Sequence, residues 1–164
     1  MKPPPLSSSA AGIKIREIDI PLHEIGFEYV EITPHKISGR LHLTERCCQP
    51  FKVLHGGISA LIAESLASMG AHIASGFTRV AGVHLSIHHL KSAQLGDLVI
   101  AEAAPVNVGQ SIQVWEVCLW KIYESNEEEK KTLIASSRVT LKTNMFVPEN
   151  AKDAAVVLKK YAKL

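Results

Sequence analysis

The chain has 164 residues, of which 46% are apolar and 21% are charged, and its formal net charge at neutral pH is +2. This length and composition fit one soluble globular domain with a core of its own. So small a net charge, with no basic run that contains interleaved aromatic residues, excludes a protein that binds nucleic acid mainly through phosphate contacts.

The first 15 residues are rich in Pro, Ser and Ala, a composition typical of a disordered lead-in. They hold no apolar stretch of the kind that a secretory signal requires. We therefore expect one folded domain over residues 16–148, followed by a tail over residues 149–164.

The folded part begins with the features of a hairpin. Residues 21–26, from a Pro to a Gly, indicate a turn or the start of a short helix. Residues 27–33 have strand composition, and residues 37–43 alternate between apolar and polar side chains. The short polar segment between these two runs predicts that they pair with each other.

Three cysteines bear on the compartment in which the protein works. Cys47 and Cys48 are adjacent in a connector over residues 44–54, and Cys118 lies in a later strand-like run. An odd number of cysteines without a Cys-x-x-Cys pair favours reduced thiols in an intracellular compartment over a disulfide framework. The adjacent pair has no cationic helper at a recognisable spacing, so we interpret it as structural.

Residues 57–75 predict one long helix, with Gly76 as its expected end. The segment is apolar on most sides, a property shared by membrane-spanning helices and by helices wrapped inside a core. It contains Glu64, His72 and four serines, and no other segment of the chain resembles a membrane span. We therefore interpret it as a core helix and expect no membrane partner.

Strand-like runs dominate the second half of the chain. They cover residues 80–90, 97–108, 111–123 and 132–143. Gly-Asp and Gly-Gln pairs mark the first two joins, and the charged sequence SNEEEKK at residues 125–131 indicates a solvated hairpin loop. The tail over residues 149–164 is expected to form a short polar helix.

The order of these elements predicts the fold class. Two strands, one long helix and four more strands with short joins imply an antiparallel sheet. The apolar helix must be covered by that sheet, so we expect an α+β fold in which a curved sheet wraps around one central helix. One sheet cannot cover every side of such a helix, and pairing of subunits is therefore expected.

Two glycines at the predicted helix start form the first candidate site. Gly56 and Gly57 leave backbone N–H groups without partners at a helix N-terminus, where the helix dipole adds partial positive charge. Such a place suits an oxyanion or a polarised carbonyl. A glycine pair before a helix is more often only a tight entry from a loop, so this feature alone decides nothing.

Glu64 is a carboxylate in the middle of the apolar helix. A charge there is costly unless it is paired or used, although an exposed helix edge explains it equally well from periodicity alone. It lies on nearly the same face as Gly57, about 10 Å further along the axis. We therefore expect it to act on a group held at the N-terminus of a neighbouring, antiparallel copy of the helix. Ser68 shares its face and is placed to orient its carboxylate by a hydrogen bond.

The sequence QPFKVLHGGISALIAESLAS at residues 49–68 resembles the motif of the hotdog-fold acyl-CoA thioesterases, in their aryl-CoA and phenylacetate-pathway branch. In that branch a Gln precedes the His-Gly-Gly triplet, a catalytic Glu follows the His by nine positions, and a Ser or Thr comes four later. The resemblance covers residues 20–145. It is closest to the peroxisomal 1,4-dihydroxy-2-naphthoyl-CoA thioesterases of plants, through residues 47–76, the sequence SIHHLKSAQLGDL and the last three residues.

The resemblance implies a role for each matched residue. Glu64 is the nucleophile or the general base that activates water, and the Gly56 N–H polarises the thioester carbonyl. Gln49 and His55 position the thioester or the water. They act with a Glu64 from the other subunit, which Ser68 supports.

The resemblance also implies the substrate and the assembly. The substrate is an aromatic acyl-CoA thioester, most closely 1,4-dihydroxy-2-naphthoyl-CoA of phylloquinone biosynthesis. Hydrolysis needs no cofactor and no metal. Family precedent implies a homodimer that forms the active site and pairs into a homotetramer.

Further residues are candidates for contacting the substrate. Gly57 adjoins the polarising amide, and His89 matches a histidine of the bacterial members and is expected to line the acyl pocket. His88 stands where the plant branch has an asparagine, which puts its role in doubt. Lys91 and Arg138 are candidates for CoA phosphates, although exposed basic side chains are common on strands.

The histidines of the run 80–90 also raise the question of a metal. His84 and His88 share one face of the predicted strand, and His89 lies on the other. No third ligand follows at a recognisable spacing and there is no His-Glu-x-x-His sequence, so we expect surface or substrate-lining histidines instead.

Three functions stay open from the sequence. A thioesterase is the first, with fatty acyl-CoA as the rival substrate to an aromatic one. A hydratase or dehydratase acting on acyl-CoA or acyl-carrier protein is the second, and the His-Gly-Gly triplet argues against it. A non-catalytic acyl-CoA binding module, in which Glu64 is structural, is the third.

The sequence Ala162-Lys163-Leu164 resembles the peroxisomal tripeptide of the SKL type, and Lys159 and Lys160 lie just upstream. We therefore expect the peroxisomal matrix as the location and a peroxisomal import receptor as a partner.

Overall fold

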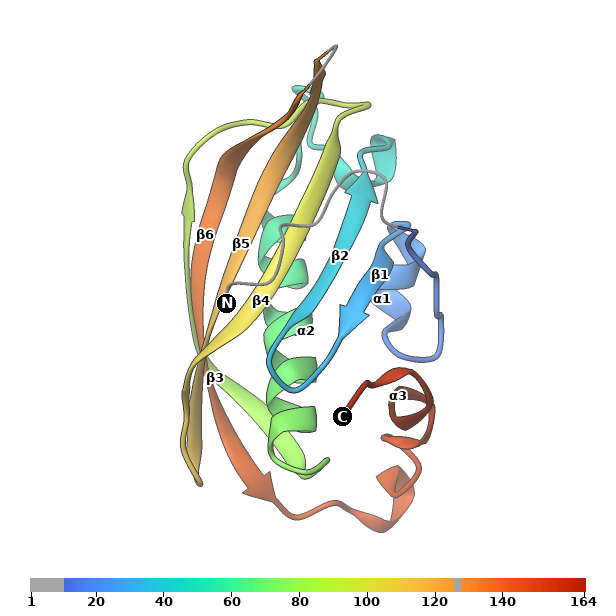
Figure 1. The fold of residues 1–164 in the computed structure, drawn as a ribbon, viewed down its shortest axis with the longest axis vertical. Helices are drawn as coiled ribbons and strands as arrows, with labels where there is room; N and C mark the ends of the chain where they lie inside the picture. Colours follow the sequence, from blue (N-terminus) through green and yellow to red (C-terminus); the bar gives the residue numbers. More distant parts are fainter. Residues whose placement is uncertain (1–10, 126–127) are drawn as a thin grey trace.

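A six-stranded antiparallel sheet curves around one long helix in the computed structural model, which describes residues 11–125 and 128–164 (Figure 1). Neighbouring strands follow the order β1-β2-β4-β5-β6-β3. The strands are β1 Glu28–Ile32, β2 Ile37–His42, β3 Arg79–His89, β4 Leu98–Val108, β5 Ile112–Ser125 and β6 Glu128–Met145. This arrangement confirms the predicted fold class.

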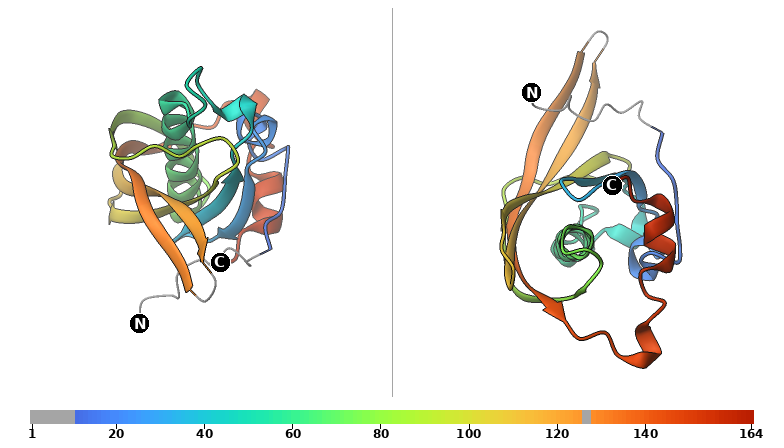
Figure 2. Two further views of the ribbon diagram at one scale, coloured as in Figure 1. Left: turned by 90° about the horizontal axis from the view of Figure 1, so that it is seen from above. Right: turned by 60° about the horizontal axis from the view of Figure 1, so that its bottom comes forward.

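The central helix α2 spans Gly56–Ala74, and the right-hand view of Figure 2 looks along its axis to show the sheet wrapping around it. It ends where Gly76 takes a left-handed φ of 73°, a conformation that glycine adopts without a steric penalty. The remaining helical elements lie outside the sheet. They are α1 Ile20–Glu24, α3 Val156–Tyr161 and two 3-10 turns, Glu45–Cys47 and Glu149–Ala151.

The core lies between α2 and the inner face of the sheet. A side chain at Gly70 would overlap the ring of Trp115, so glycine lets the helix approach the largest buried side chain of β5. The indole Nε1 of Trp115 donates to Oε1 of Gln113 at 2.8 Å, and Nε2 of Gln113 donates to the carbonyl of Ala71 at 3.3 Å. The buried polar groups of β5 therefore tie the sheet to α2 as well as packing against it.

The apolar character of α2 is accounted for by this core. By length and composition alone the helix could cross a membrane, but half of its apolar window is buried inside the protein. Ile62 and Leu66 have no exposed surface because they pack against the sheet. A helix covered in this way needs apolar residues on most of its sides.

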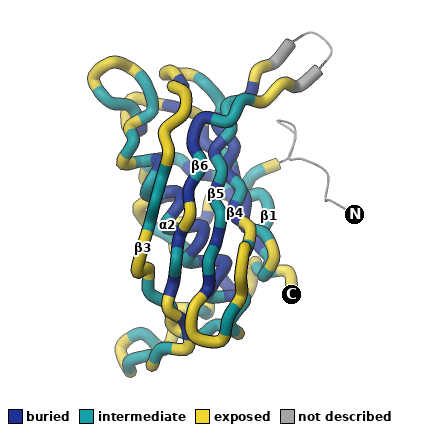
Figure 3. The backbone as a smooth tube through the Cα atoms, turned by 90° about the vertical axis from the view of Figure 1, so that its left-hand side faces the viewer, coloured by how far each residue is buried: buried dark blue, intermediate teal, exposed yellow. Residues whose placement is uncertain are grey.

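Strand β3 is an edge of the sheet, although it precedes β4 in the chain. It pairs with β6, and in the described part of the chain its other edge has no strand partner. Figure 3 shows that β3 is half-buried to exposed along its length, and Val83 is 58% exposed. A long unpaired edge next to an incompletely covered helix is a surface suited to pairing with another copy.

Three segments differ from the expectations drawn from the sequence. The lead-in is shorter than the expected 15 residues, because Ile13 exchanges two hydrogen bonds with Tyr29 and Ile15 is buried in the core; residues 1–10 lie outside the described part. The expected loop over 125–131 is mostly strand, since β5 reaches Ser125 and β6 begins at Glu128, with residues 126–127 outside the description. The tail forms a 3-10 turn and the helix α3 instead of one helix.

Candidate active site

The backbone N–H groups at the start of α2 differ in whether they are paired. His55 is the N-cap residue, and its ring Nδ1 accepts the N–H of Gly57 at 2.9 Å. Its carbonyl accepts from Ile58 and Ser59 at 2.9 and 3.2 Å. The N–H of Gly56 has no acceptor among the described residues, so it is the amide at the helix start that is available to a ligand.

The loop before α2 holds Gln49 beside this amide. The loop turns back on itself at Lys52, which has a φ of 61°, and the N–H of Gln49 donates to Val53 at 2.9 Å. The side-chain oxygen of Gln49 accepts the N–H of Phe51 at 2.6 Å. The turn therefore holds the side-chain oxygen of Gln49, and the amide NH₂ is the part of the side chain that can donate to a ligand.

His89 also lies beside the start of α2. It lies opposite Ala135 of β6, which is buried, so its side chain faces α2. A Cβ at Gly56 would be 3.2 Å from Nε2 of His89, which places the ring directly against the helix start. Gln49, Gly56, Ser59, His89 and Lys91 line a shared cavity of about 390 Å³. We call this cavity the amide cavity.

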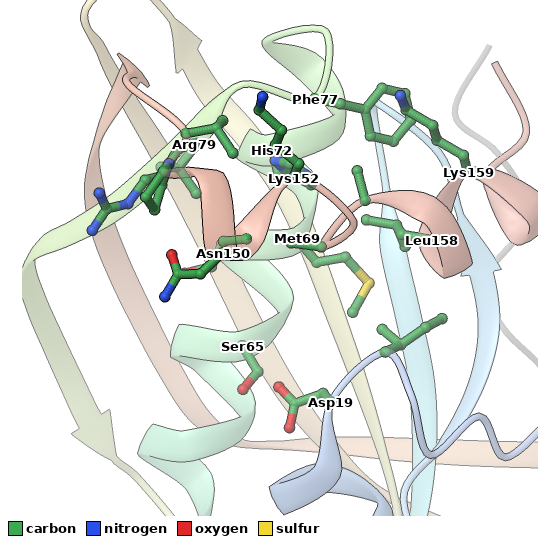
Figure 4. Close-up of a pocket in the computed structure, with 18 of the residues that line it drawn as sticks. Asp19, Ser65, Met69, His72, Phe77, Arg79, Asn150, Lys152, Leu158 and Lys159 are labelled. Atoms are coloured by element: carbon green, nitrogen blue, oxygen red, sulfur yellow. The ribbon is translucent and has the colours of Figure 1, made fainter.

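Glu64 and Ser68 line a different cavity of about 690 Å³, which we call the carboxylate cavity. One wall is α2, and the opposite wall is the segment over residues 147–159, which includes the beginning of α3. Figure 4 shows Ser65 and Met69 on the helix side and Asn150 and Leu158 on the opposite side. The structure brings Ser68 to the cavity of Glu64, but the expected hydrogen bond between the two side chains is not formed.

The two cavities hold complementary parts of the predicted site. Gly56 and Glu64 are separated by about 12 Å along the axis of α2. The amide cavity and the carboxylate cavity have no lining residue in common. One chain therefore holds the predicted polarising amide and the predicted acidic side chain in two separate cavities.

Comparison with known proteins identifies the family. Residues 51–124 match the thioesterase superfamily. A protein of Arabidopsis thaliana named 1,4-dihydroxy-2-naphthoyl-CoA thioesterase 2 is 58% identical over 143 residues, which are 87% of this chain and 91% of the relative. The chain belongs to the thioesterase superfamily.

Other members of the superfamily agree with this assignment. A Listeria monocytogenes protein named 1,4-dihydroxy-2-naphthoyl-CoA hydrolase is 38% identical over 71% of this chain and 89% of its own. The crystal structure of a Haemophilus influenzae thioesterase superposes with a TM-score of 0.63 at 28% identity, covering 79% of this chain and 85% of the other. The sheet wrapped around α2 is thus the hotdog fold of the superfamily.

Two residues predicted to contact the substrate, Arg138 and His88, lie away from both cavities within a single chain. Nη2 of Arg138 pairs with Oε1 of Glu116 at 3.0 Å, and His88 lies opposite Ser136. Because residues such as Ser137 and Val139 are buried against the core, Arg138 and Ser136 alternate with them on the outer face of the sheet. Neither Arg138 nor His88 lines either cavity. Their roles stay predictions.

The sequence raised two alternative centres, a metal site and a reactive cysteine. No group of three His, Cys, Asp or Glu side chains that could hold a metal occurs within residues 11–125 and 128–164. Partial burial raises the pKa of the Cys48 thiol, and the neighbouring Cys47 raises it further. A thiol with a raised pKa is a weak nucleophile, in keeping with a structural interpretation of this pair.

The sequence did not reveal two features of the surroundings of Glu64. The segment over residues 147–159 is far from Glu64 in the chain and has no motif that points to a site. Gly82 in β3 lies directly under the Glu64 carboxylate. Its signal was present, because a glycine inside a strand-like run marks a bulge or a close approach, but a single sequence does not say what approaches.

Proposed function

We propose that this protein hydrolyses an aromatic acyl-CoA thioester to the free acid and CoA, with 1,4-dihydroxy-2-naphthoyl-CoA as its substrate. The observation that carries the proposal is the N–H of Gly56 at the helix start, which has no acceptor among the described residues, combined with the Glu64 carboxylate in a cavity of its own. Two similar proteins, from Arabidopsis and Listeria, are named for this substrate, which supports the choice of acyl group.

The chemistry needs these two groups on one thioester. The carbonyl oxygen accepts from the Gly56 N–H, which stabilises negative charge on that oxygen as the carbonyl carbon is attacked. In one route Glu64 takes a proton from water as the water oxygen attacks, the C–S bond breaks, and the CoA thiolate leaves and is protonated. In the other route a Glu64 oxygen attacks, CoA leaves, and water hydrolyses the mixed anhydride.

The apolar lining of the carboxylate cavity is proposed to receive the acyl group. Met69, Val80 and Leu158 line it next to Glu64, and its volume of about 690 Å³ lies in the range of small-molecule pockets. The segment over residues 147–159 then forms the wall that faces an aromatic ring.

Two copies of the chain are proposed to form each active site. Antiparallel pairing along the free edge of β3 carries the Gly56 amide of one copy toward Glu64 of the other, which a single chain holds about 12 Å apart. Family precedent extends this arrangement to a homotetramer made of two such dimers. Sedimentation of the purified protein measures the assembly, and a monomer would contradict the shared site.

Thiol release tests the reaction and the substrate together. Naphthoyl, phenylacetyl and palmitoyl thioesters are compared, and release is expected to be fastest with the naphthoyl compound. Glu64→Gln is expected to lower kcat by about 10²-fold to 10⁴-fold, as for loss of a general base. Glu24 is an exposed carboxylate at the end of α1, so Glu24→Gln makes the same chemical change there and is the matched control. A Glu64→Gln protein that works at full rate removes the proposal.

Mixing two inactive variants tests the shared site. Glu64→Gln and Gly56→Pro each damage one half of the site. In a mixed dimer, one of the two sites receives an intact Glu64 from one copy and an intact Gly56 from the other. Random exchange of subunits is then expected to restore about a quarter of the wild-type rate, since half of the dimers have one intact site. A site built within one chain would restore nothing.

The peroxisomal matrix is the proposed location, with import through Ala162-Lys163-Leu164. Leu164 is 87% exposed, which supports access of a receptor to this sequence. A fluorescent protein placed before residue 1 is expected to colocalise with a peroxisomal marker in plant cells. Removal of Leu164 is expected to leave it diffuse, and a diffuse signal from the unaltered chain contradicts the proposal.

A further inference from the structure

The Glu64 carboxylate rests directly on the main chain of Gly82. A Cβ built at Gly82 would overlap Oε1 of Glu64 and would lie 2.9 Å from its Cδ and 3.2 Å from its Oε2. Cβ atoms in proteins essentially never approach another heavy atom within 3.0 Å. Any residue other than glycine at this position therefore forces the carboxylate to move.

The clash at this position is one of space and not of backbone conformation. Gly26, Gly76 and Gly96 have left-handed φ angles of 88°, 73° and 90°, and nothing lies near the place of their missing side chains. At Gly82 the φ angle is not left-handed, and the Glu64 side chain of α2 occupies the position that a side chain at residue 82 would take. The backbone at Gly82 would accept an alanine if Glu64 were elsewhere.

A β-bulge next to Gly82 extends the relationship to the other half of the site. Gly82 lies opposite Leu141 and His84 opposite Thr140, so β3 advances by two residues while β6 advances by one. Strict alternation would place Gly82 and His89 on opposite faces of the strand. The bulge reverses the alternation, so Gly82 faces Glu64 at one end of β3 while His89 faces Gly56 at the other.

We infer that Gly82 is a positioning residue for hydrolysis, fixing where the Glu64 carboxylate stands relative to the bound thioester, and that the bulge after it lets one strand serve both half sites. The catalytic part of this inference rests on the proposed function. The contact between Gly82 and Glu64 does not.

Gly82→Ala tests the positioning role. The added methyl group displaces the carboxylate by about 1 Å, and kcat is expected to fall about 10²-fold while KM changes little. Glu64→Asp shortens the side chain and withdraws it from the methyl group. In the Glu64→Asp background, Gly82→Ala is therefore expected to cost little further in kcat or in melting temperature.

The four melting temperatures of this double-mutant cycle need no substrate. Gly39→Ala is the matched control, because a Cβ there would overlap Phe27 and the carbonyl of Glu28, far from the carboxylate. Its loss of melting temperature should be the same with Glu64 as with Glu64→Asp.

The outcomes separate this inference from the proposed function. If Gly82→Ala lowers the melting temperature equally in the Glu64 and the Glu64→Asp backgrounds, the contact is overturned. If Glu64→Asp rescues the melting temperature but Gly82→Ala alone does not lower kcat, the positioning role is overturned. If Gly82→Ala alone fails to fold, folding of the double variant supports the contact and failure of the double variant overturns it. A protein that releases no thiol from any thioester refutes the proposed function, while the melting cycle still decides the contact.

Discussion

Nδ1 of His55 accepts the N–H of Gly57 at 2.9 Å, and this contact determines which amide at the start of α2 is free. A ring nitrogen that accepts a hydrogen bond carries no proton, so the proton of the neutral ring lies on Nε2. Within the described chain the Gly57 N–H is occupied and the Gly56 N–H is not. His55 thus caps the helix and leaves the Gly56 N–H as the donor that we propose polarises the thioester carbonyl.

Gly56→Pro removes this free amide while changing little else. Proline is favoured at the first position of a helix, and His55 before it has φ −68° and ψ 128°, a conformation that a following proline accepts. We expect kcat to fall about 10²-fold or more, as on loss of one oxyanion donor. Gly56→Ala keeps the N–H and adds the same Cβ, so it controls for the contact with His89. Equal activities of the two variants would show that this amide does not bind the carbonyl oxygen.

His55→Asn and His55→Ala separate the capping role of His55 from the proposed catalytic role. Asparagine is a good N-cap residue, whereas alanine is expected to lower the free energy of unfolding by about 1 kcal/mol. Both substitutions remove the ring Nε2 from the site, so both should lower thiol release. Denaturant unfolding and thiol release measured on the same samples give the two effects. A fully active His55→Asn protein would show that His55 acts only as a helix cap.

Local patterns in the sequence predicted the elements that carry the site. The apolar segment containing a glycine pair and Glu64 is the central helix α2, and the alternation within the run 80–90 placed His89 on the opposite face from His88. These features depend on neighbours a few residues away, which periodicity captures. The separation of Gly56 and Glu64 into two cavities also follows from helix geometry alone.

Features set by distant parts of the chain were not predictable in the same way. The short joins gave no sign that β3 leaves its neighbour β4 and pairs with β6, and this pairing creates the free edge. Arg138 was chosen for its charge, but its position opposite Ser86 puts it on the outer face of the sheet, where it pairs with Glu116. The wall formed by residues 147–159 depends on how the end of the chain folds back, for which one sequence gives no periodic signal.

Ala151→Trp tests whether the carboxylate cavity receives the acyl group. Ala151 is half-buried and lines the wall opposite α2, so an indole there occupies space that an aromatic ring would need. We expect kcat/KM for the naphthoyl thioester to fall at least about 10-fold, while a short acyl thioester loses much less. Val156→Trp lies in the same segment but does not line the cavity, and it serves as the control. A uniform loss across acyl groups would contradict this assignment.

Tyr29 makes the stability of the fold sensitive to alkaline pH. Its side chain is 2% exposed, and its hydroxyl has no hydrogen-bond partner among the described residues. Burial raises the pKa of Tyr29 well above the ordinary value of 10.0, and the carboxylate of Asp19 raises it further. The folded protein therefore keeps this proton at a pH where the unfolded chain has lost it. The stabilisation is complete below about pH 10 and is lost as the pH rises through the raised folded value.

Tyr29→Phe is expected to change stability in two ways. At neutral pH the free energy of unfolding should rise by about 1 kcal/mol, because a buried hydroxyl without a partner is removed. Above about pH 10 the decline of stability with pH should become shallower, because the proton difference between the folded and unfolded chains is smaller. Urea unfolding at neutral and alkaline pH measures both effects. Tyr161→Phe, which alters an exposed phenol of α3, is the control and should change neither. If Tyr29→Phe is less stable at neutral pH, the hydroxyl has a partner in solution and the buried phenol is satisfied.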